Sequence, residues 1–266
     1  METDFTINVI DEPNTRKRRL SFRYPPFFIV FISIFELFSF LYYALRSDEP
    51  ITLIGPVPFN SKLIYNPYRR YEVWRYFTYI FIHAGYWHIS FNILIQLAVG
   101  IPLEVVHKFH SIFIIYIGGA IGGALGNSIA DPHSYLAGAS SGCYALIAAH
   151  LSNLILNWEE MKSPWFKFSS LMIFSIADFG TAVYERHSKY GAYRTSYGGH
   201  LAGAISGLLL GLVFLRNIKI YRWEERVAII AAAIYVIFIV SRLLSLHKIL
   251  QTQLLSTNTS LLYPIN

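Results

Sequence analysis

The sequence has little charge and almost no cysteine. Only 14% of its 266 residues are charged, whereas a soluble domain usually carries about 25%. A single cysteine, Cys143, excludes an intrachain disulfide and zinc sites built from several thiolates. The net charge of +6 comes from short basic clusters between apolar segments rather than from one basic face, which argues against nucleic acid binding. The composition is therefore not that of a soluble globular protein.

Long apolar stretches take the place of charge, because 54% of the residues are hydrophobic and 17% are aromatic. A helix needs about 20 apolar residues to cross the hydrocarbon core of a bilayer. Stretches of this length, separated by Pro, Gly or charged residues, predict an all-α polytopic membrane bundle. The seven predicted spans are residues 25–45, 76–99, 109–130, 136–157, 166–184, 198–215 and 227–245.

The basic residues predict the orientation of the bundle. A run of four, Arg16 to Arg19, precedes the first span and favours a cytoplasmic amino-terminal tail over residues 1–24. This segment does not resemble a cleavable signal peptide, since no small-residue cleavage site follows the apolar stretch. Seven spans then place residues 247–266, with the glycosylation sequon at Asn258, on the luminal or extracellular side.

Several polar side chains lie inside the predicted spans, where each costs at least about 2.5 kcal/mol. The second span contains His83, His88 and Asn92, the fourth opens at Ser140 and the sixth opens at His200. In the predicted orientation these groups share the outer halves of three helices, which predicts one buried site. The alternative is that they are interhelical hydrogen bonds that only hold the bundle together.

A serine beside a histidine is the minimum required for nucleophilic acyl transfer, because the imidazole takes the hydroxyl proton as attack begins. His88 and Asn92 are four residues apart and share a helix face, so with the Ser140 N–H they form a candidate oxyanion hole. Tyr144 is one turn beyond Ser140, where its ring is expected to brace the imidazole. Small residues let the helices approach, namely Gly138, Ala139, Ser141 and Gly142 on the fourth span and Gly199, Gly203 and Gly207 on the sixth.

Other polar residues receive structural interpretations. Asp178 is a candidate third member of a catalytic triad, but its place in the middle of the fifth span favours a structural partner. Glu36 is interpreted as a paired packing residue, and Glu104 as a residue that fixes a helix end by hydrogen bonding. Cys143 is interpreted as a small buried packing residue. Further expectations concern the outer loops: Trp74 and Arg75 set the first loop at the membrane interface, and Asp131, Pro132, His133 and residues 185–198 lie over the entrance to the site.

These motifs closely resemble those of the rhomboid intramembrane serine proteases. The family's Trp-Arg pair is Trp74-Arg75, its His-x-x-x-Asn motif runs from His88 to Asn92, and its serine motif corresponds to GASSGCYAL around Ser140. The His-x-x-Gly-x-x-x-Gly motif begins at His200. The likeness covers roughly residues 60–245 and extends to the animal secretase-type, or rhomboid-related, subgroup, which carries a seventh helix after the core.

The resemblance implies a six-helix catalytic core at residues 25–215, a loop and seventh helix at 216–246, and a dyad of Ser140 and His200. It implies oxyanion roles for His88 and Asn92, no metal and no cofactor. Expected substrates are single-pass membrane proteins cut near the outer end of their helix, with growth-factor precursors as one candidate class. The expected location is the secretory pathway, in the Golgi, endosome or plasma membrane. The supporting residues are Tyr144, His83, Gly138, Ser141, Gly199 and Gly203.

One residue departs from the family pattern. The position after the nucleophile, commonly glycine, is Ser141 here, so composition alone leaves two candidate nucleophiles. The four-residue spacing to Tyr144 selects Ser140. Two other functions compete with proteolysis: a non-catalytic rhomboid-like binder that escorts membrane clients for trafficking or degradation, and a transporter with a polar pathway. Reaction of an activated serine with a fluorophosphonate separates proteolysis from both.

Overall fold

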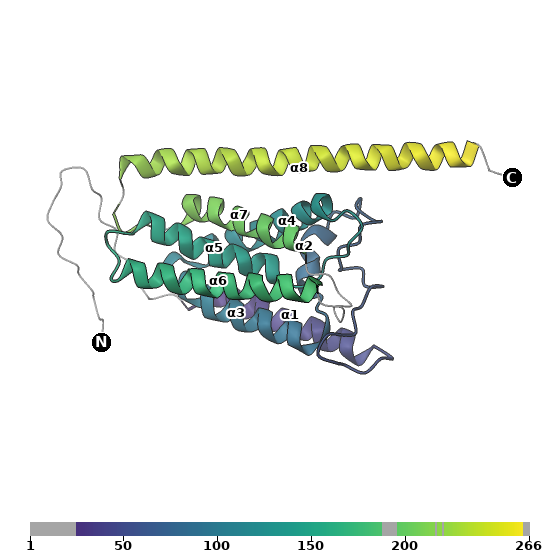
Figure 1. Cartoon of the computed structure of the whole chain (residues 1–266), viewed down its shortest axis with the longest axis horizontal. Coiled ribbons are helices and arrows are strands. Elements are labelled where there is room, and N and C mark those ends of the chain that lie inside the picture. Colours follow the sequence, from purple (N-terminus) through teal and green to yellow (C-terminus); the bar gives the residue numbers. More distant parts are fainter. Residues whose placement is uncertain (1–24, 188–195, 216, 220, 263–266) are drawn as a thin grey trace.

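The computed structural model describes residues 25–187, 196–215, 217–219 and 221–262. Its regular structure is helical, which confirms the predicted all-α class, and an antiparallel bridge joins Tyr65 to Leu136. The long helices run side by side along one direction (Figure 1). In chain order the elements are α1 (Phe27–Leu45), α2 (Arg75–Thr78), the 3-10 helix η1 (Tyr79–Phe81), α3 (Gly85–His107), α4 (Phe109–Ala130), α5 (Ser140–Leu156), α6 (Pro164–His187), α7 (Tyr197–Phe214) and α8 (Arg222–Leu262).

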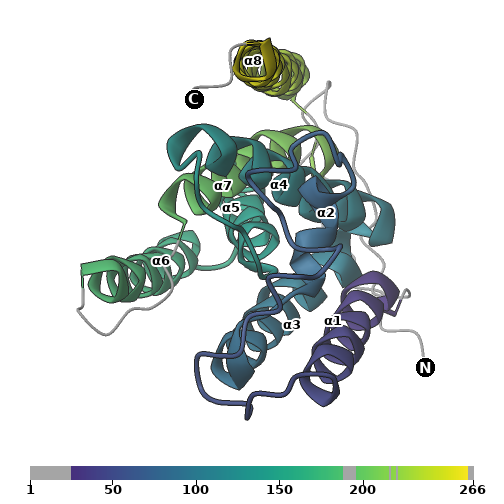
Figure 2. The same cartoon turned by 90° about the vertical axis from the view of Figure 1, so that its right-hand side faces the viewer.

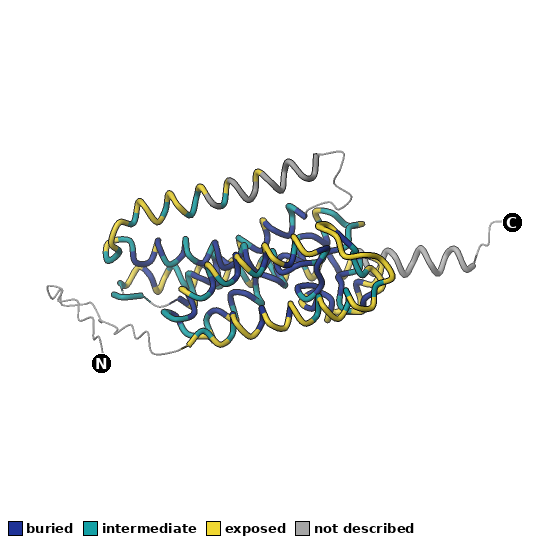
Figure 3. The backbone as a smooth tube through the Cα atoms, turned by 90° about the horizontal axis from the view of Figure 1, so that it is seen from below, coloured by how far each residue is buried: buried dark blue, intermediate teal, exposed yellow. Residues whose placement is uncertain are grey.

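Three helices form the centre of the bundle. Viewed along the helix axes, α4, α5 and α7 are central, α1 and α3 pack on one side, and α6 and α8 lie at the periphery (Figure 2). Buried positions concentrate in that centre (Figure 3). Glycines of α4 allow the close packing, because Ala145 of α5 lies directly against Gly119 and Ser206 of α7 against Gly122. Residues 46–74 and 131–139 connect helices at one end, which we call the loop end (Figure 1).

Among the residues that the structure describes, five helices are long and apolar enough to cross a membrane: α1, α3, α4, α7 and the Arg222–Lys248 part of α8. The helix α5 is apolar but only 17 residues long. The bounds of α4 coincide with the predicted span at residues 109–130, and those of α1, α5, α6 and α7 differ from prediction by a few residues.

The second predicted span, residues 76–99, is wrong at its start. The chain there forms α2 and η1, and the long helix α3 begins only at Gly85, whose φ of 71° favours glycine. The N–H groups of Tyr86 and Trp87 donate to carbonyls of the 46–74 loop at 3.1 and 3.2 Å. Because the loop satisfies these first-turn donors, the helix begins at Gly85 and His83 lies in the connection before it, not on the helix.

The same prediction is wrong at its end, because α3 continues through Gly100 and Pro102 to His107. Gly100 lets Ile29 of α1 pack on the helix backbone, since an added Cβ would lie 2.6 Å from Ile29 Cδ1. Pro102 is exposed, where the loss of one backbone hydrogen bond is tolerated in a helix of this length.

The last helix is longer than its predicted span of residues 227–245. The helix α8 runs to Leu262 and extends past the other helices at the loop end (Figure 1). Its sequence contains neither glycine nor proline before Pro264, so no residue breaks the helix where the apolar stretch ends. The predicted tail at residues 247–266 is therefore helical up to residue 262, including the backbone of Asn258.

Glu104 fixes the start of α1. Its two carboxylate oxygens accept the N–H groups of Phe28 at 2.7 Å and Ile29 at 2.8 Å. These donors belong to the first turn of α1 and have no partner within their own helix. Glu104 lies on α3, so the helix end that its side chain holds is the start of α1 and not the end of α3.

A chain of buried hydrogen bonds links α1, α3 and α4. The Ser33 hydroxyl donates to the Ile29 carbonyl at 2.7 Å, so Ser33 Oγ accepts from Gln96 Nε2 at 2.8 Å. Gln96 then presents Oε1 to the Tyr116 hydroxyl at 2.6 Å, which must be the donor. Tyr116 Oη also lies 2.8 Å from Glu36 Oε1. Since its proton is already used, Glu36 must supply the proton of that bond, and the carboxyl group is neutral.

Candidate functional site

Ser140 and His200 meet at the loop end of the bundle. Ser140 is the first residue of α5, and His200 lies in the first turn of α7. The Nε2 atom of His200 is 2.8 Å from Ser140 Oγ. His200 is buried, whereas Ser140 is only partly buried. The structure thus brings together the two residues that the sequence predicted to act as a pair.

Glycines on α7 permit this approach. A Cβ added at Gly203 would lie 2.5 Å from the Ser141 carbonyl oxygen, and Gly207 packs directly on the backbone of Ala145. No other residue fits at Gly203 without moving α5 away from α7. The helix start is also fixed, because Ser196 Oγ accepts the Gly199 N–H at 3.0 Å.

Tyr144 holds the imidazole from one side. Its ring stacks on His200 with centroids 4.4 Å apart and an angle of 25° between the planes. The ring leaves the His200 nitrogens free to bond in the imidazole plane. In the part of the chain that the structure describes, His200 Nδ1 has no hydrogen-bond partner. Asp178 lies on α6, but its side chain is outside the described residues.

His88 and Asn92 approach from α3. The Ala84 N–H donates to His88 Nδ1 at 3.4 Å, so the proton of a neutral imidazole is on Nε2. His88 Nε2 faces Gly138, whose φ is 102° and where an added Cβ would lie 2.5 Å from that nitrogen. Asn92 is buried, and its Nδ2 donates to the His88 carbonyl at 2.7 Å.

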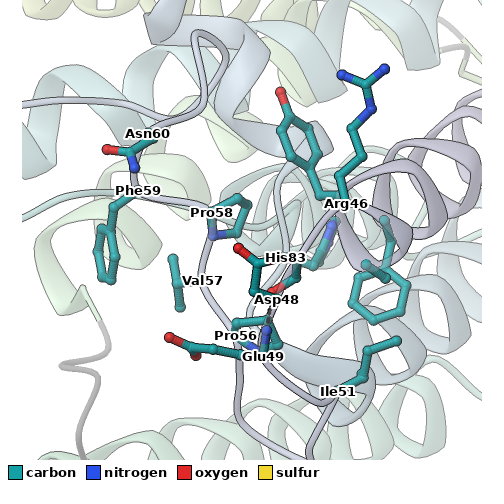
Figure 4. Close-up of a pocket in the computed structure, with 14 residues that line it drawn as sticks. Arg46, Asp48, Glu49, Ile51, Pro56, Val57, Pro58, Phe59, Asn60 and His83 are labelled. Atoms are coloured by element: carbon teal, nitrogen blue, oxygen red, sulfur yellow. Dashed lines mark hydrogen bonds between the residues drawn. The ribbon is translucent and has the colours of Figure 1, made fainter.

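His83 joins the site from the connection before α3. Its Nε2 atom lies 3.4 Å from the N–H of Ala139, the residue before Ser140, and its ring centroid is 5.2 Å from that of His88. His83 therefore contacts the backbone of the Ser140 turn instead of sharing the helix face of His88. A cavity of about 430 Å³ at the loop end reaches this histidine, with Asp48, Glu49 and Pro56 in its wall (Figure 4).

Ser141 does not share the surroundings of Ser140. It is fully buried and packs against Gly123 of α4, where an added Cβ would lie 2.5 Å from the Ser141 side chain. Ser141 is packed between glycines of α4 and α7, whereas Ser140 is the serine that contacts His200. This difference is expected for residues about 100° apart on a helix.

The loop at residues 46–74 is held by Trp74 and Arg75. The Trp74 indole N–H donates to the Lys62 carbonyl at 3.1 Å. Arg75 Nη1 donates to two loop carbonyls, those of Ser61 at 2.9 Å and Ile64 at 2.7 Å, and its Nε pairs with Glu72. These bonds fix the loop that precedes α3 and hence the start of the helix that carries His88.

A second arginine of this loop was not predicted. Arg70 is buried and donates to the carbonyls of Pro67, at 2.9 Å, and Pro132. It thereby ties the 46–74 loop to the 131–139 connection that leads to Ser140. Beside it, burial raises the pKa of the Tyr65 hydroxyl above its usual value, although the charge of Arg70 acts in the opposite direction. The only hint in the sequence was the doubled arginine at residues 69–70.

A profile of the Rhomboid domain matches residues 70–217. The chain belongs to the rhomboid family. This rhomboid is 40% identical over 195 residues to Inactive rhomboid-related protein 2 of Caenorhabditis elegans, covering 73% of this chain and 56% of that protein. It is 36% identical over 222 residues to Rhomboid-related protein 3 of Homo sapiens, covering 81% of this chain and 55% of that protein. It is 38% identical over 223 residues to Rhomboid-related protein 1 of Caenorhabditis elegans, covering 80% of this chain and 62% of that protein.

The comparisons confirm the predicted family and its animal rhomboid-related relatives. As a rhomboid with five candidate spans, the chain is a multi-pass integral membrane protein. It spans between 55% and 62% of the length of these three relatives. One of them is named inactive, so family membership alone does not establish catalysis.

Proposed function

We propose that this rhomboid is an intramembrane serine endopeptidase with a catalytic dyad of Ser140 and His200. The observation that carries the proposal is the 2.8 Å contact between Ser140 Oγ and His200 Nε2. A second contact supports it, because the stacked ring of Tyr144 holds the imidazole in the orientation that this bond requires. A pair that served only as interhelical glue would not need such a brace.

In the proposed reaction, Ser140 Oγ attacks the carbonyl carbon of the scissile bond while its proton moves to His200 Nε2. The carbon–nitrogen bond then breaks, and the same proton passes to the departing amine. An ester between Ser140 and the acyl part of the substrate remains. Water attacks this ester, gives a proton to Nε2 and forms the carboxylic acid, and His200 returns the proton to Ser140.

The negative oxygen of the tetrahedral intermediate needs donors that are already in place. His88 Nε2 carries a proton in the tautomer that the Ala84 N–H selects. Asn92 Nδ2 has a second hydrogen besides the one donated to the His88 carbonyl. The Ser140 N–H belongs to the first turn of α5, where amides lack an acceptor within the helix. We assign these three donors to the oxyanion.

An apolar cavity beside the dyad supports the proposed substrate class. The cavity has a volume of about 480 Å³ and lies between α5, α6 and α7, with Tyr144, Ile147, Leu171 and Ile176 in its wall. Apolar walls suit the transmembrane helix of a single-pass protein. Because helical peptide bonds are protected by their own hydrogen bonds, the segment must unwind near the cut. Small or helix-breaking residues there are expected to favour cleavage.

The proposed topology has six helices in the catalytic core and α8 as the seventh. The amino terminus is proposed to lie in the cytoplasm, and the protein to reside in membranes of the secretory pathway. The loop end then faces the lumen or the cell exterior, and the product is a released ectodomain. Water reaches the dyad from this end, where the cavity at His83 opens.

A non-catalytic function has one observation in its favour, the name of the inactive relative. A binder of membrane clients would use the same apolar cavity without chemistry. Growth-factor precursors remain a candidate substrate class for the enzyme, and membrane clients in trafficking or degradation for the binder.

The test is co-expression with candidate single-pass proteins, scored by the ectodomain released into the medium. The proposal predicts release by the wild type and none by Ser140→Ala or His200→Ala. Ser152→Ala is the matched control. Ser152 also lies on α5, and its hydroxyl donates to the Leu208 carbonyl of α7 at 2.8 Å. This contact lies at least two helical turns from the dyad. Release that persists in a membrane-inserted Ser140→Ala protein would refute the enzyme and leave the binder.

A further inference from the structure

The single cysteine of the chain touches a residue of the proposed oxyanion hole. Cys143 is 4% exposed and lies three residues after Ser140 on α5. Its Sγ atom is 3.8 Å from Asn92 Oδ1 and 3.6 Å from the Asn92 backbone oxygen. Both oxygens are acceptors, so the thiol is the donor of the contact.

A second hydrogen bond joins the same two helices farther from the site. His150 Nε2 lies 2.8 Å from the Val99 carbonyl. His150 is seven residues after Cys143 on α5, and Val99 is seven residues after Asn92 on α3. Seven residues are about two helical turns, so the same faces of the two helices meet at both places. Ile95 and Ile147 fill the space between them.

The amide of Asn92 is constrained on its nitrogen side as well. Nδ2 donates to the His88 carbonyl at 2.7 Å, which requires Oδ1 to point elsewhere. The thiol of Cys143 lies where Oδ1 then points. Contacts on both sides restrict the rotation of the amide and favour one direction for the second Nδ2 hydrogen.

We propose that Cys143 is a positioning residue for the oxyanion hole. Its thiol donates to Asn92 Oδ1 and holds the amide so that Nδ2 is presented to the developing negative oxygen. The proposal rests on the proposed function, because an oxyanion forms only if Ser140 attacks a carbonyl. It assigns Cys143 a function beyond the packing that the sequence predicted.

The test combines kinetics with a matched set of variants. Cys143→Val keeps the approximate volume and removes the donor, Cys143→Ser keeps a donor, and His150→Leu removes the other hydrogen bond of the interface. The substrate is a quenched-fluorescence peptide with one apolar transmembrane segment and small residues at its outer end, reconstituted with the enzyme in lipid vesicles. Cys143→Val is expected to lower kcat about threefold to tenfold with little change in KM. Cys143→Ser is expected to retain a higher kcat than Cys143→Val, and His150→Leu is expected to leave kcat near the wild-type value.

A double-mutant comparison separates positioning from packing. In an Asn92→Ala background, Cys143→Val is expected to have no further effect on kcat, because the group that it orients is gone. An equal loss of kcat in both backgrounds, or a full wild-type kcat in Cys143→Val, would overturn the proposal.

The thiol also supplies a readout that does not need activity. A single cysteine gives a single S–H stretching band in the infrared spectrum. Asn92→Ala is expected to move this band toward the position of a free thiol. An unmoved band would mean that the thiol donates to the backbone carbonyl, which refutes the positioning role. A wild type that neither cleaves the peptide nor reacts with a fluorophosphonate would instead refute the proposed function, and the band would still report on the bond.

Discussion

Because the Glu36 carboxyl group is neutral, its replacement by an amide is expected to have little effect on stability. Glu36 is completely buried, with Oε1 2.8 Å from Tyr116 Oη and Oε2 3.3 Å from Gln96 Nε2. If Glu36 donates to Tyr116 and accepts from Gln96, then Glu36→Gln preserves both bonds. The new amide nitrogen takes the place of the protonated Oε1 and donates to Tyr116. The amide oxygen takes the place of Oε2 and accepts from Gln96. The change in the free energy of unfolding is expected to stay within about 0.5 kcal/mol.

Removal of the side chain gives the opposite result. Glu36→Ala leaves Tyr116 Oη without its donor and one Gln96 hydrogen without its acceptor. Interhelical hydrogen bonds in membranes average about 0.6 kcal/mol each, and a cavity left by a large-to-small change in a core costs about 2 kcal/mol or more. The sum is a loss of about 3 kcal/mol. Glu36→Leu fills the space without the bonds and is expected to lie between Gln and Ala.

The assay is unfolding of the purified protein in a fixed detergent, followed by circular dichroism, with the three variants and the wild type in parallel. An ionised carboxylate would accept two hydrogen bonds worth about 1.5–3 kcal/mol each, and Glu36→Gln would then destabilise the protein about as much as Glu36→Ala. That result would refute the proton assignment along the whole chain from Ser33 to Glu36.

Three further predictions concern the site and the topology. His88→Ala and Asn92→Ala are each expected to lower the cleavage rate by up to about 100-fold while the serine still reacts with a fluorophosphonate, since oxyanion donors act mainly in the transition state; full activity in both variants would make them structural. Ser141→Gly is expected to retain cleavage, because Ser141 packs against Gly123 and not against His200; inactivity with normal folding would shift the nucleophile by one residue. A tag with its own sequon after Asn258 is expected to be glycosylated, and a cytosolic carboxyl terminus would contradict the seven-span topology.

The sequence predicted the helices well where apolar length alone decides them. The bounds of α4 follow from a largely apolar stretch without Asp, Glu, Lys or Arg between Lys108 and Asp131. The convergence of α5 and α7 was also predictable, because glycines at positions 203 and 207 lie on one helix face and permit close approach. The start of α3 was not predictable, since loop carbonyls from the distant 52–53 segment decide where that helix begins.

Contacts that depend on the rotation of two helices could not be read from the sequence. Whether Cys143 faces Asn92 or the lipid depends on how α5 turns against α3, which no single-helix pattern determines. The bond from Arg70 to Pro132 joins two loops that lack any periodic pattern. The charge state of Glu36 likewise follows only from the order of donors and acceptors in three helices.

The central claim is that His200 activates Ser140 as a nucleophile, and the most direct measurement is the mapping of a covalent adduct. Purified protein in detergent or lipid is treated with a fluorophosphonate, digested and analysed by mass spectrometry. One modified serine is expected, Ser140, whose labelling is lost in His200→Ala and retained in Ser141→Gly. An adduct on Ser141, or equal labelling of Ser140 in the wild type and in His200→Ala, would contradict this claim.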